Sequence, residues 1–227
     1  MTVRKLYLFR HGETQWNVAG RMQGRLDSPL TERGEQQALA HGRLLEDLSA
    51  PECFWVSTAN RTRHTADLIN LGVQRPLHYS DDLVERDCGL WSGKTLEQVQ
   101  SEYPDDWAQR EVNAYHHRPG GGENIPDLVA RFSRLFEQWQ QPSCLAIVTH
   151  GVVSRAMLGH FLDLPDDRVA SIRHPNELFY ELSFDGEHRS VRYYQADLHA
   201  DGSAFAHSGV AIEGLCEGEP RQGQTSE

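Results

Sequence analysis

The sequence has no long hydrophobic run, few cysteines and no concentration of basic residues. Near its start, only the apolar segment 6–9 follows Arg4 and Lys5 before Arg10 interrupts it, far short of a signal-peptide core or a membrane span. The 4 cysteines lie far apart without a Cys-x-x-Cys pair, as is typical of reduced structural thiols. These absences predict a cytoplasmic protein that does not enter a membrane.

An excess of positive charge is also absent, because the formal net charge is -11 at pH 7. Nucleic acids and anionic membranes bind concentrated basic faces that displace their counterions. The composition therefore predicts neither partner, and any anion site must be local. Among the 12 histidines there is no His-Glu-x-x-His pattern, and the adjacent His116 and His117 cannot share a helix face. We expect no catalytic metal and no cofactor.

The order of the predicted elements indicates one α/β domain. Short apolar segments predict strands at 6–9, 53–56, 77–79, 145–148, 178–184 and 191–194. Helical spacing and helix-start residues predict helices at 31–48, 61–71, 95–103, 104–113, 126–139 and after 151. Because strands and helices alternate, we expect a three-layer α/β/α sandwich with a mostly parallel central sheet and an antiparallel edge strand.

Local signals define the expected boundaries. Thr31 and Asn124 are suitable N-caps for the first and fifth predicted helices, and Gly72 is expected to end the second. We expect one domain over residues 1–198. Residues 199–227 are rich in Gly, Ala, Ser and Glu and are expected to form a flexible C-terminal tail.

The tripeptide Arg10-His11-Gly12 stands where the first predicted strand ends. A strand end holds its side chain at a fixed place above the sheet edge, arginine can clamp a phosphate through two parallel hydrogen bonds, and glycine lets a substrate approach the backbone. The pattern therefore indicates a nucleophilic histidine. An ordinary strand exit is the alternative.

His150-Gly151 repeats this arrangement, with an apolar strand before it and a predicted helix after it. The carboxyl ends of parallel strands share one sheet edge, so His150 and His11 are expected to meet there. The helix that begins after Gly151 would direct its positive end toward an anion. Taken alone, His150 could instead be a core or capping histidine.

Two further side chains are expected at the same edge. Arg61 stands near the start of a helix, where the helix dipole disfavours a cation unless an anion binds; a surface arginine is the alternative. Glu85 lies in the loop after the third strand, and a nearby phosphate would raise its pKa, so it could act as a general acid. A solvated acidic residue is the alternative for Glu85.

Several motifs in one order resemble the histidine phosphatase superfamily, in its phosphoglycerate mutase-like branch. The resemblance covers most of residues 3–195. Its motifs are RHGETQWN at 10–17, GRMQG at 20–24, SPLTERG at 28–34, STANRTRHTA at 57–66, ERDCGLWSG at 85–93, PGGGEN at 119–124 and VTHG at 148–151. Departures at Ala59, His64 and Asn124 concern specificity rather than chemistry.

The resemblance implies a phosphohistidine on His11, with Glu85 as proton donor and then base. It implies that the phosphoryl oxygens bind to Arg10, Arg61 and His150. Positions that line the phosphate or substrate pocket in the family match Asn17, Gln23 and Gly24, and Gly151 is a further candidate for substrate binding. Arg118, beside His116 and His117, is a candidate for contact with a second anionic group of the substrate.

The preferred hypothesis is a metal-independent phosphatase acting on a small phosphorylated metabolite. A cofactor-dependent phosphoglycerate mutase is the alternative, but mutases exclude water with a long basic insertion, and the segment 86–149 is short with few basic residues. A non-catalytic phosphate sensor is the second alternative, and it has no need of both a nucleophile and an acid. A homodimer could form at aromatic residues predicted to be exposed, such as Trp107 or Tyr115.

Overall fold

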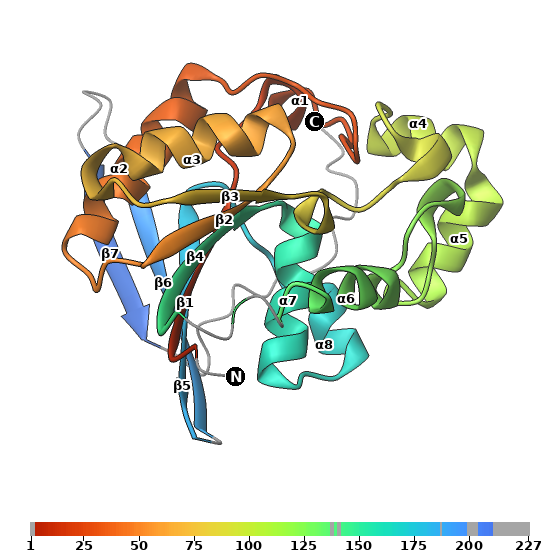
Figure 1. Cartoon of the computed structure of the whole chain (residues 1–227). Helices are drawn as coiled ribbons and strands as arrows, with labels where there is room; N and C mark the ends of the chain where they lie inside the picture. Colours follow the sequence, from red (N-terminus) through yellow and green to blue (C-terminus); the bar gives the residue numbers. More distant parts are fainter. Residues whose placement is uncertain (1–2, 137–138, 140–141, 187, 199–203, 211–227) are drawn as a thin grey trace.

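The computed structural model describes residues 3–136, 139, 142–186, 188–198 and 204–210, which form a seven-stranded sheet with helices on both faces (Figure 1). The strand order is β3-β2-β4-β1-β5-β6-β7. The strands are β1 (Lys5–Arg10), β2 (Cys53–Ser57), β3 (Leu77–Ser80), β4 (Cys144–Thr149), β5 (Leu178–Asp185), β6 (His188–Leu198) and β7 (Ala204–Val210). Strands β3, β2, β4 and β1 run parallel, and the last three add antiparallel pairs. The predicted α/β/α sandwich is confirmed.

Helices cover both faces of the sheet (Figure 1). On the first face lie α2 (Glu32–Glu46) and α3 (Asn60–Val73); on the second lie α6 (Ile125–Ser133), α7 (Gly151–Leu162) and α8 (Asp166–Ser171). The remaining helices, beside one end of the sheet, are α1 (Gln15–Val18), α4 (Leu96–Glu102) and α5 (Pro104–Val112), with short 3-10 turns at Asp81–Leu83, Gly89–Trp91 and Pro119–Gly121.

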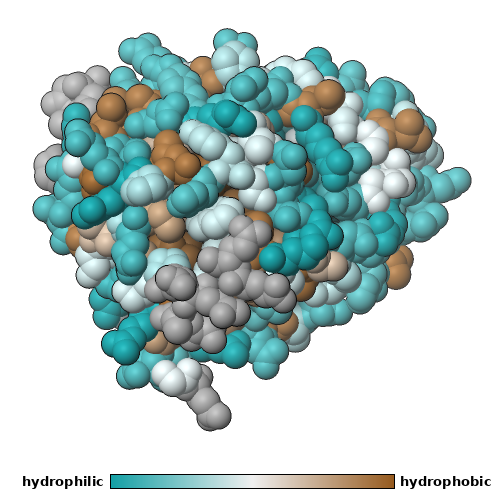
Figure 2. Space-filling view, in the orientation of Figure 1, coloured by the Kyte–Doolittle hydropathy of each residue, from teal (hydrophilic) through white to brown (hydrophobic). Residues whose placement is uncertain are grey.

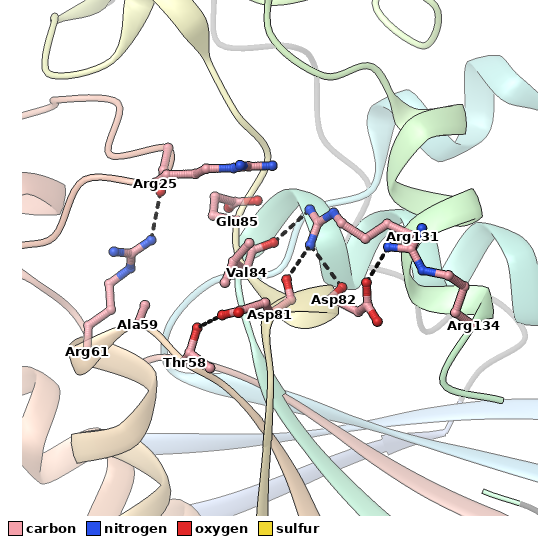
Figure 3. Close-up of a pocket in the computed structure, with 11 residues that line it drawn as sticks. Arg25, Thr58, Ala59, Arg61, Asp81, Asp82, Val84, Glu85, Arg131 and Arg134 are labelled. Carbon is pink, nitrogen blue, oxygen red and sulfur yellow. Dashed lines mark hydrogen bonds and ion pairs between the residues drawn. The ribbon is translucent and has the colours of Figure 1, made fainter. Parts of the chain in front are cut away.

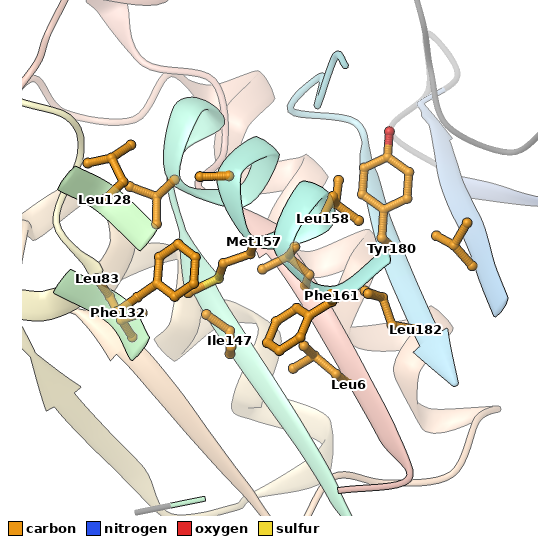
Figure 4. Packing of buried hydrophobic residues seen from close by; sticks show 14 of the residues in the cluster. Leu6, Leu83, Leu128, Phe132, Ile147, Met157, Leu158, Phe161, Tyr180 and Leu182 are labelled. Carbon is orange, nitrogen blue, oxygen red and sulfur yellow. The ribbon is translucent and has the colours of Figure 1, made fainter. Parts of the chain in front are cut away.

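Alternation along the strands divides the core between the two faces. Leu6 and Leu8 of β1 pack with α6 and α7, whereas Tyr7 and Phe9 pack with α2 and α3. Figure 4 shows the larger cluster, in which Met157 of α7 lies against the sheet. All six residues of β4 are buried, as expected for an apolar strand with helices on both sides.

The predicted N-caps are confirmed. Thr31 accepts a hydrogen bond from Gly34 N, and Asn124 forms a capping box with Asp127. Gly72 does not end its helix, however. Helix α3 continues to Val73, and the C-cap is Gln74 with φ 49°. The nearest group to Gly72 is the exposed Glu46 carboxylate of α2, the end of a side chain that can move, so no close packing requires glycine here.

The predicted helix over 126–139 is too long, since α6 ends at Ser133. Beyond it, residues 134–136 and 139 lie in turns, with Leu135 N donating to Phe132 O and Trp139 N donating to Phe136 O. Leu135 and Trp139 are nevertheless buried with the α6 side chains. Apolar spacing predicted their burial correctly, but it did not distinguish a helix from successive turns that direct side chains to the same core.

The expected tail over 199–227 is wrong for Ala204–Val210, which form β7 and pair antiparallel with β6. The open edge of β6 supplies backbone hydrogen-bond partners to this segment, which its composition does not reveal. Residues 199–203 and 211–227 lie outside the described residues.

Trp107 is not an exposed aromatic residue as expected. It is 9% exposed, and its ring lies 5.8 Å from that of Trp91. Tyr115 is half-buried. Figure 2 shows a largely hydrophilic face on which hydrophobic residues form small, separate patches. Trp107 and Tyr115 therefore do not support a dimer interface, and the homodimer stays a prediction.

No helix in the described part of the chain is long and apolar enough to span a membrane.

Candidate active site

His11 and His150 lie side by side at the ends of adjacent parallel strands. Arg10 pairs with Thr149 in the β1–β4 register, and each histidine is the next residue along its strand. The imidazole centroids are 5.3 Å apart. Both side chains are buried, and His150 occupies the N-cap position of α7. Parallel topology thus brings together two residues that are far apart in the sequence.

The surroundings of His11 select one tautomer. Burial, then the charges of Arg10 and Arg61, hold the pKa of His11 well below its usual range, so the imidazole is neutral. Its Nδ1 lies 2.8 Å from the carbonyl oxygen of Gly12, which can only accept. Nδ1 therefore bears the hydrogen, and the Nε2 lone pair is available for attack.

The backbone at this strand end is held tightly. Gly12 N donates to Thr65 Oγ1 at 3.0 Å, and Asn176 Nδ2 donates to His11 O at 2.7 Å. A Cβ on Gly12 would collide with the carbonyl group of Gly34. Glycine is therefore required at this position because two backbone segments cross in direct contact.

Two arginines frame the histidines. Arg10 donates through its guanidinium to His174 O at 2.7 Å. Arg61 is 2% exposed and donates to Gly24 O at 3.0 Å and to the Asp27 carboxylate at 2.9 Å. The buried Nε of Arg61 has no hydrogen-bond partner in the described part of the chain, so one donor of this guanidinium remains for an anion.

Glu85 stands beside these groups and contacts the first turn of α7. One carboxylate oxygen accepts from Val152 N at 3.2 Å, and the other accepts from Arg86 N at 2.7 Å. Glu85 and Arg61 both line a cavity of 450 Å³ (Figure 3). The two histidines are not among the residues that line this cavity. Its other lining residues include Gly24, Arg25, Thr58, Asp81, Arg131 and Arg134.

The predicted binding residues have different positions. Gly24 lines the cavity with φ 52°, and the Arg10 guanidinium lies 3.5 Å from where a Cβ on Gly151 would stand. Gln23 is buried beside Thr14, to which its Nε2 donates at 2.7 Å. Asn17 does not line the cavity, because its Oδ1 accepts from Thr14 N in a capping box.

Arg118, predicted to contact a second anionic group of the substrate, forms an ion pair on the surface, and its role stays a prediction. Arg118 donates to the Asp127 carboxylate at 2.8 Å. The neighbouring His116 and His117 face Asp166 at 3.1 Å and Asp106 at 3.2 Å. All three side chains thus lie against carboxylates, which the sequence does not reveal for the histidines because Asp166 and Asp106 lie on other elements.

Arg86, Arg110 and Arg155 form a second group of cationic side chains, whose charges act on one another. Burial and then the nearby Arg86 guanidinium lower the pKa of Arg155 to about 10, and charges from Arg110 and Arg10 act in the same direction. No carboxylate of the described residues lies within ion-pair distance of Arg86, Arg110 or Arg155. Sequence reasoning missed Arg155, although its position on the helix that follows His150 was a signal.

Metal ligands do not gather in the described residues, where no group of three or more His, Cys, Asp or Glu could hold an ion. The arrangement can instead bind a small anion between cationic side chains and present a neutral imidazole nitrogen to it.

An α/β sandwich with paired histidines at adjacent strand ends defines the histidine phosphatase class. The model of the histidine phosphatase superfamily (branch 1) matches residues 6–197, and the chain belongs to this family. The predicted resemblance is therefore confirmed.

Curated relatives include the 6-phosphofructo-2-kinase/fructose-2,6-bisphosphatase of Gallus gallus, 34% identical over 184 residues, which are 81% of this chain and 38% of that protein. The Homo sapiens 6-phosphofructo-2-kinase/fructose-2,6-bisphosphatase 1 is 33% identical over the same coverage of 81% and 38%. The chain thus spans 38% of the length of these two relatives.

Solved structures of similar fold include the α-ribazole phosphatase of Shigella flexneri, with a TM-score of 0.74 and 26% identity over 82% of this chain and 93% of that chain. A mycobacterial glucosyl-3-phosphoglycerate phosphatase in complex with VO3 has a TM-score of 0.72 and 26% identity over 92% of this chain and 99% of that chain.

Proposed function

We propose that the protein is a phosphoric monoester hydrolase that acts without a metal, through a phosphohistidine on His11. The observation that supports this most is the hydrogen bond between His11 Nδ1 and Gly12 O, in a ring that lies beside the ring of His150 and whose pKa is lowered by burial and by the charges of Arg10 and Arg61. A phosphate sensor would not need a histidine that is oriented as a nucleophile.

In the first step, His11 Nε2 attacks phosphorus and the ester P–O bond breaks. Arg10, Arg61 and His150 hold the phosphoryl oxygens, and Glu85 protonates the departing alkoxide. In the second step, water attacks the phosphohistidine, the Glu85 carboxylate takes the water proton, and His11 leaves as neutral imidazole. Each proton that Glu85 gives is thereby returned, and the products are the alcohol and phosphate.

The binding groups and the positioned nucleophile are together sufficient to lower the barrier to phosphomonoester hydrolysis by the required amount. Phosphomonoester hydrolysis needs roughly 20 kcal/mol of barrier reduction. Three preorganised donors contribute about 3 to 4 kcal/mol each, and positioning of a bound nucleophile contributes about 7 to 11 kcal/mol. No single arginine would suffice, so the reaction depends on the whole group.

We further propose that the substrate has a second anionic group, bound by Arg86, Arg110 and Arg155 in place of the predicted Arg118. No ion pair joins these arginines to a carboxylate among the described residues, and the charges of Glu85 and Arg10 both act on Arg155. The names of the curated relatives point the same way, because fructose 2,6-bisphosphate has two phosphates. The cytoplasmic location remains a prediction.

The test measures phosphate release from a panel of phosphomonoesters. The panel includes fructose 2,6-bisphosphate, α-ribazole 5'-phosphate and glucosyl-3-phosphoglycerate, together with 3-phosphoglycerate plus 2,3-bisphosphoglycerate. We expect release that a chelator does not reduce and that His11→Ala abolishes. Full activity of His11→Ala, or loss under chelation with rescue by a metal, contradicts the mechanism. Isomerisation without release would identify a mutase, and a phosphohistidine that never turns over would identify a sensor.

A variant separates the second anion site from the chemistry. Arg155→Met should raise KM for a bisphosphate at least tenfold, because a charge-assisted hydrogen bond contributes about 1.5 to 3 kcal/mol. The same variant should change KM for a monophosphate without another charge much less. An equal change for both substrates contradicts the second site.

A further inference from the structure

Ser57 is a buried hydroxyl group in contact with the second histidine, and no role is assigned to it above. It is the last residue of β2, whose neighbour in the sheet is β4, and it is fully buried. Its Oγ lies 2.7 Å from His150 Nε2. The other ring nitrogen of His150, Nδ1, is buried and has no hydrogen-bond partner within the described residues.

One hydrogen lies between Ser57 and His150, and its donor can be determined. Burial, followed by the charges of Arg61 and His11, holds the pKa of His150 well below its usual range. The ring is therefore neutral and has a single N–H. Either Nε2–H donates to Ser57 and Nδ1 is bare, or the Ser57 hydroxyl donates to Nε2 and Nδ1 bears the hydrogen.

The second contact of Ser57 decides between these arrangements. Its Oγ also accepts a hydrogen bond from Ala59 N at 3.4 Å. In the described part of the chain, His150 Nε2 is the one acceptor bonded to the Ser57 hydroxyl. If Nε2 were the donor, the hydroxyl hydrogen of Ser57 would be buried without an acceptor. That arrangement would leave two buried groups unpaired, the Ser57 hydroxyl hydrogen and the Nδ1 lone pair, whereas a donating hydroxyl leaves only Nδ1–H unpaired. Each buried polar group left unpaired is unfavourable, so the Ser57 hydroxyl donates.

We propose that Ser57 is a positioning residue that holds His150 as the Nδ1–H tautomer, so that Nδ1–H donates to an oxygen of the phosphoryl group on His11. The donor role rests on the proposed function, whereas the tautomer does not. Both histidines are then Nδ1–H tautomers, but one acts as the nucleophile and the other as a hydrogen-bond donor. His11 donates Nδ1–H to Gly12 O and attacks through Nε2, whereas His150 accepts at Nε2 and donates through Nδ1.

The tautomer is measured directly by 15N-detected NMR of the imidazole nitrogens in the wild-type full chain at neutral pH. We expect His150 Nδ1 to resonate as a protonated nitrogen and Nε2 as an unprotonated one. Addition of inorganic phosphate should perturb the Nδ1–H signal. A protonated Nε2 in the free protein overturns the proposal whether or not the protein has phosphatase activity. Failure to hydrolyse any ester, with Nδ1 protonated, would refute the proposed function alone.

Variants then test the link to Ser57. Ser57→Ala should move the proton toward Nε2 and weaken inorganic phosphate binding about tenfold, the effect of losing one hydrogen bond. Ser57→Thr keeps the hydroxyl in a strand that tolerates β-branching and should retain the wild-type tautomer and affinity.

The matched control is Thr62→Val. Thr62 Oγ1 is a neighbouring buried hydroxyl whose single hydrogen is shared between the carbonyls of Ser57 and Ala59, and within the described residues it is not hydrogen-bonded to His150. This variant should leave the Nδ1 signal of His150 unchanged. An unchanged tautomer and affinity in Ser57→Ala, or the same shift in Thr62→Val as in Ser57→Ala, contradicts a specific role for Ser57.

Discussion

Mild acid should destabilise this protein, because its core contains buried histidines that are neutral in the folded state. Burial lowers the pKa of His41 to about 4, and burial with the charge of Arg10 lowers that of His174 to about 3. His11 and His150 are displaced in the same direction. In the unfolded chain a histidine has a pKa of about 6.5.

The sign follows from proton linkage. Below pH 6.5 these histidines bind protons in the unfolded state but not in the folded state, so the free energy of unfolding falls as the pH falls. At pH 5, His41 and His174 each remove about 2 kcal/mol from the free energy of unfolding, relative to its value at neutral pH. Their combined loss of about 4 kcal/mol is a large part of the 5 to 15 kcal/mol that stabilises a typical domain.

The assay is urea unfolding between pH 7.5 and 5, followed by circular dichroism. The midpoint should fall steeply below pH 6.5. His41→Phe places a third aromatic ring against Phe9 and Phe179 and should remove about 2 kcal/mol of the loss at pH 5, whatever its effect at pH 7.5. A stability that stays constant from pH 7.5 to 5, or an equal acid loss in the variant, refutes the reasoning.

Two further predictions concern the strand end that holds His11. Gly12→Ala should lower the free energy of unfolding by about 1 to 3 kcal/mol, because a Cβ would collide with the Gly34 backbone. The same collision should displace the Gly12 carbonyl that orients His11 and reduce activity. A melting temperature and activity within error of wild type would contradict this. Asn176→Ala should lower kcat about tenfold with little change in KM, since the hydrogen bond to His11 O supports the nucleophile rather than the substrate. A change in KM alone would show that Asn176 acts on substrate binding.

Much of the fold could be predicted because its signals are local. The apolar run of β4 and the capping side chains of Thr31 and Asn124 act within a few residues of themselves. The clearest error arose where a distant partner decides: Ala204–Val210 form β7 because the edge of β6, earlier in the chain, supplies hydrogen-bond partners. Helix α3 continues past Gly72 to Val73, and Arg118 forms an ion pair with Asp127 that its sequence position does not reveal.

The sequence by itself determined which residues stand at the strand ends, and parallel topology then brings His11 and His150 to one edge. Only the tertiary structure decided where their protons lie. Protonation depends on burial and on arginine charges, and each tautomer depends on one hydrogen-bond partner, namely Gly12 O for His11 and Ser57 for His150. Ser57 and His150 are 93 residues apart in the chain, so the contact that orients the second histidine exists only once the sheet has formed.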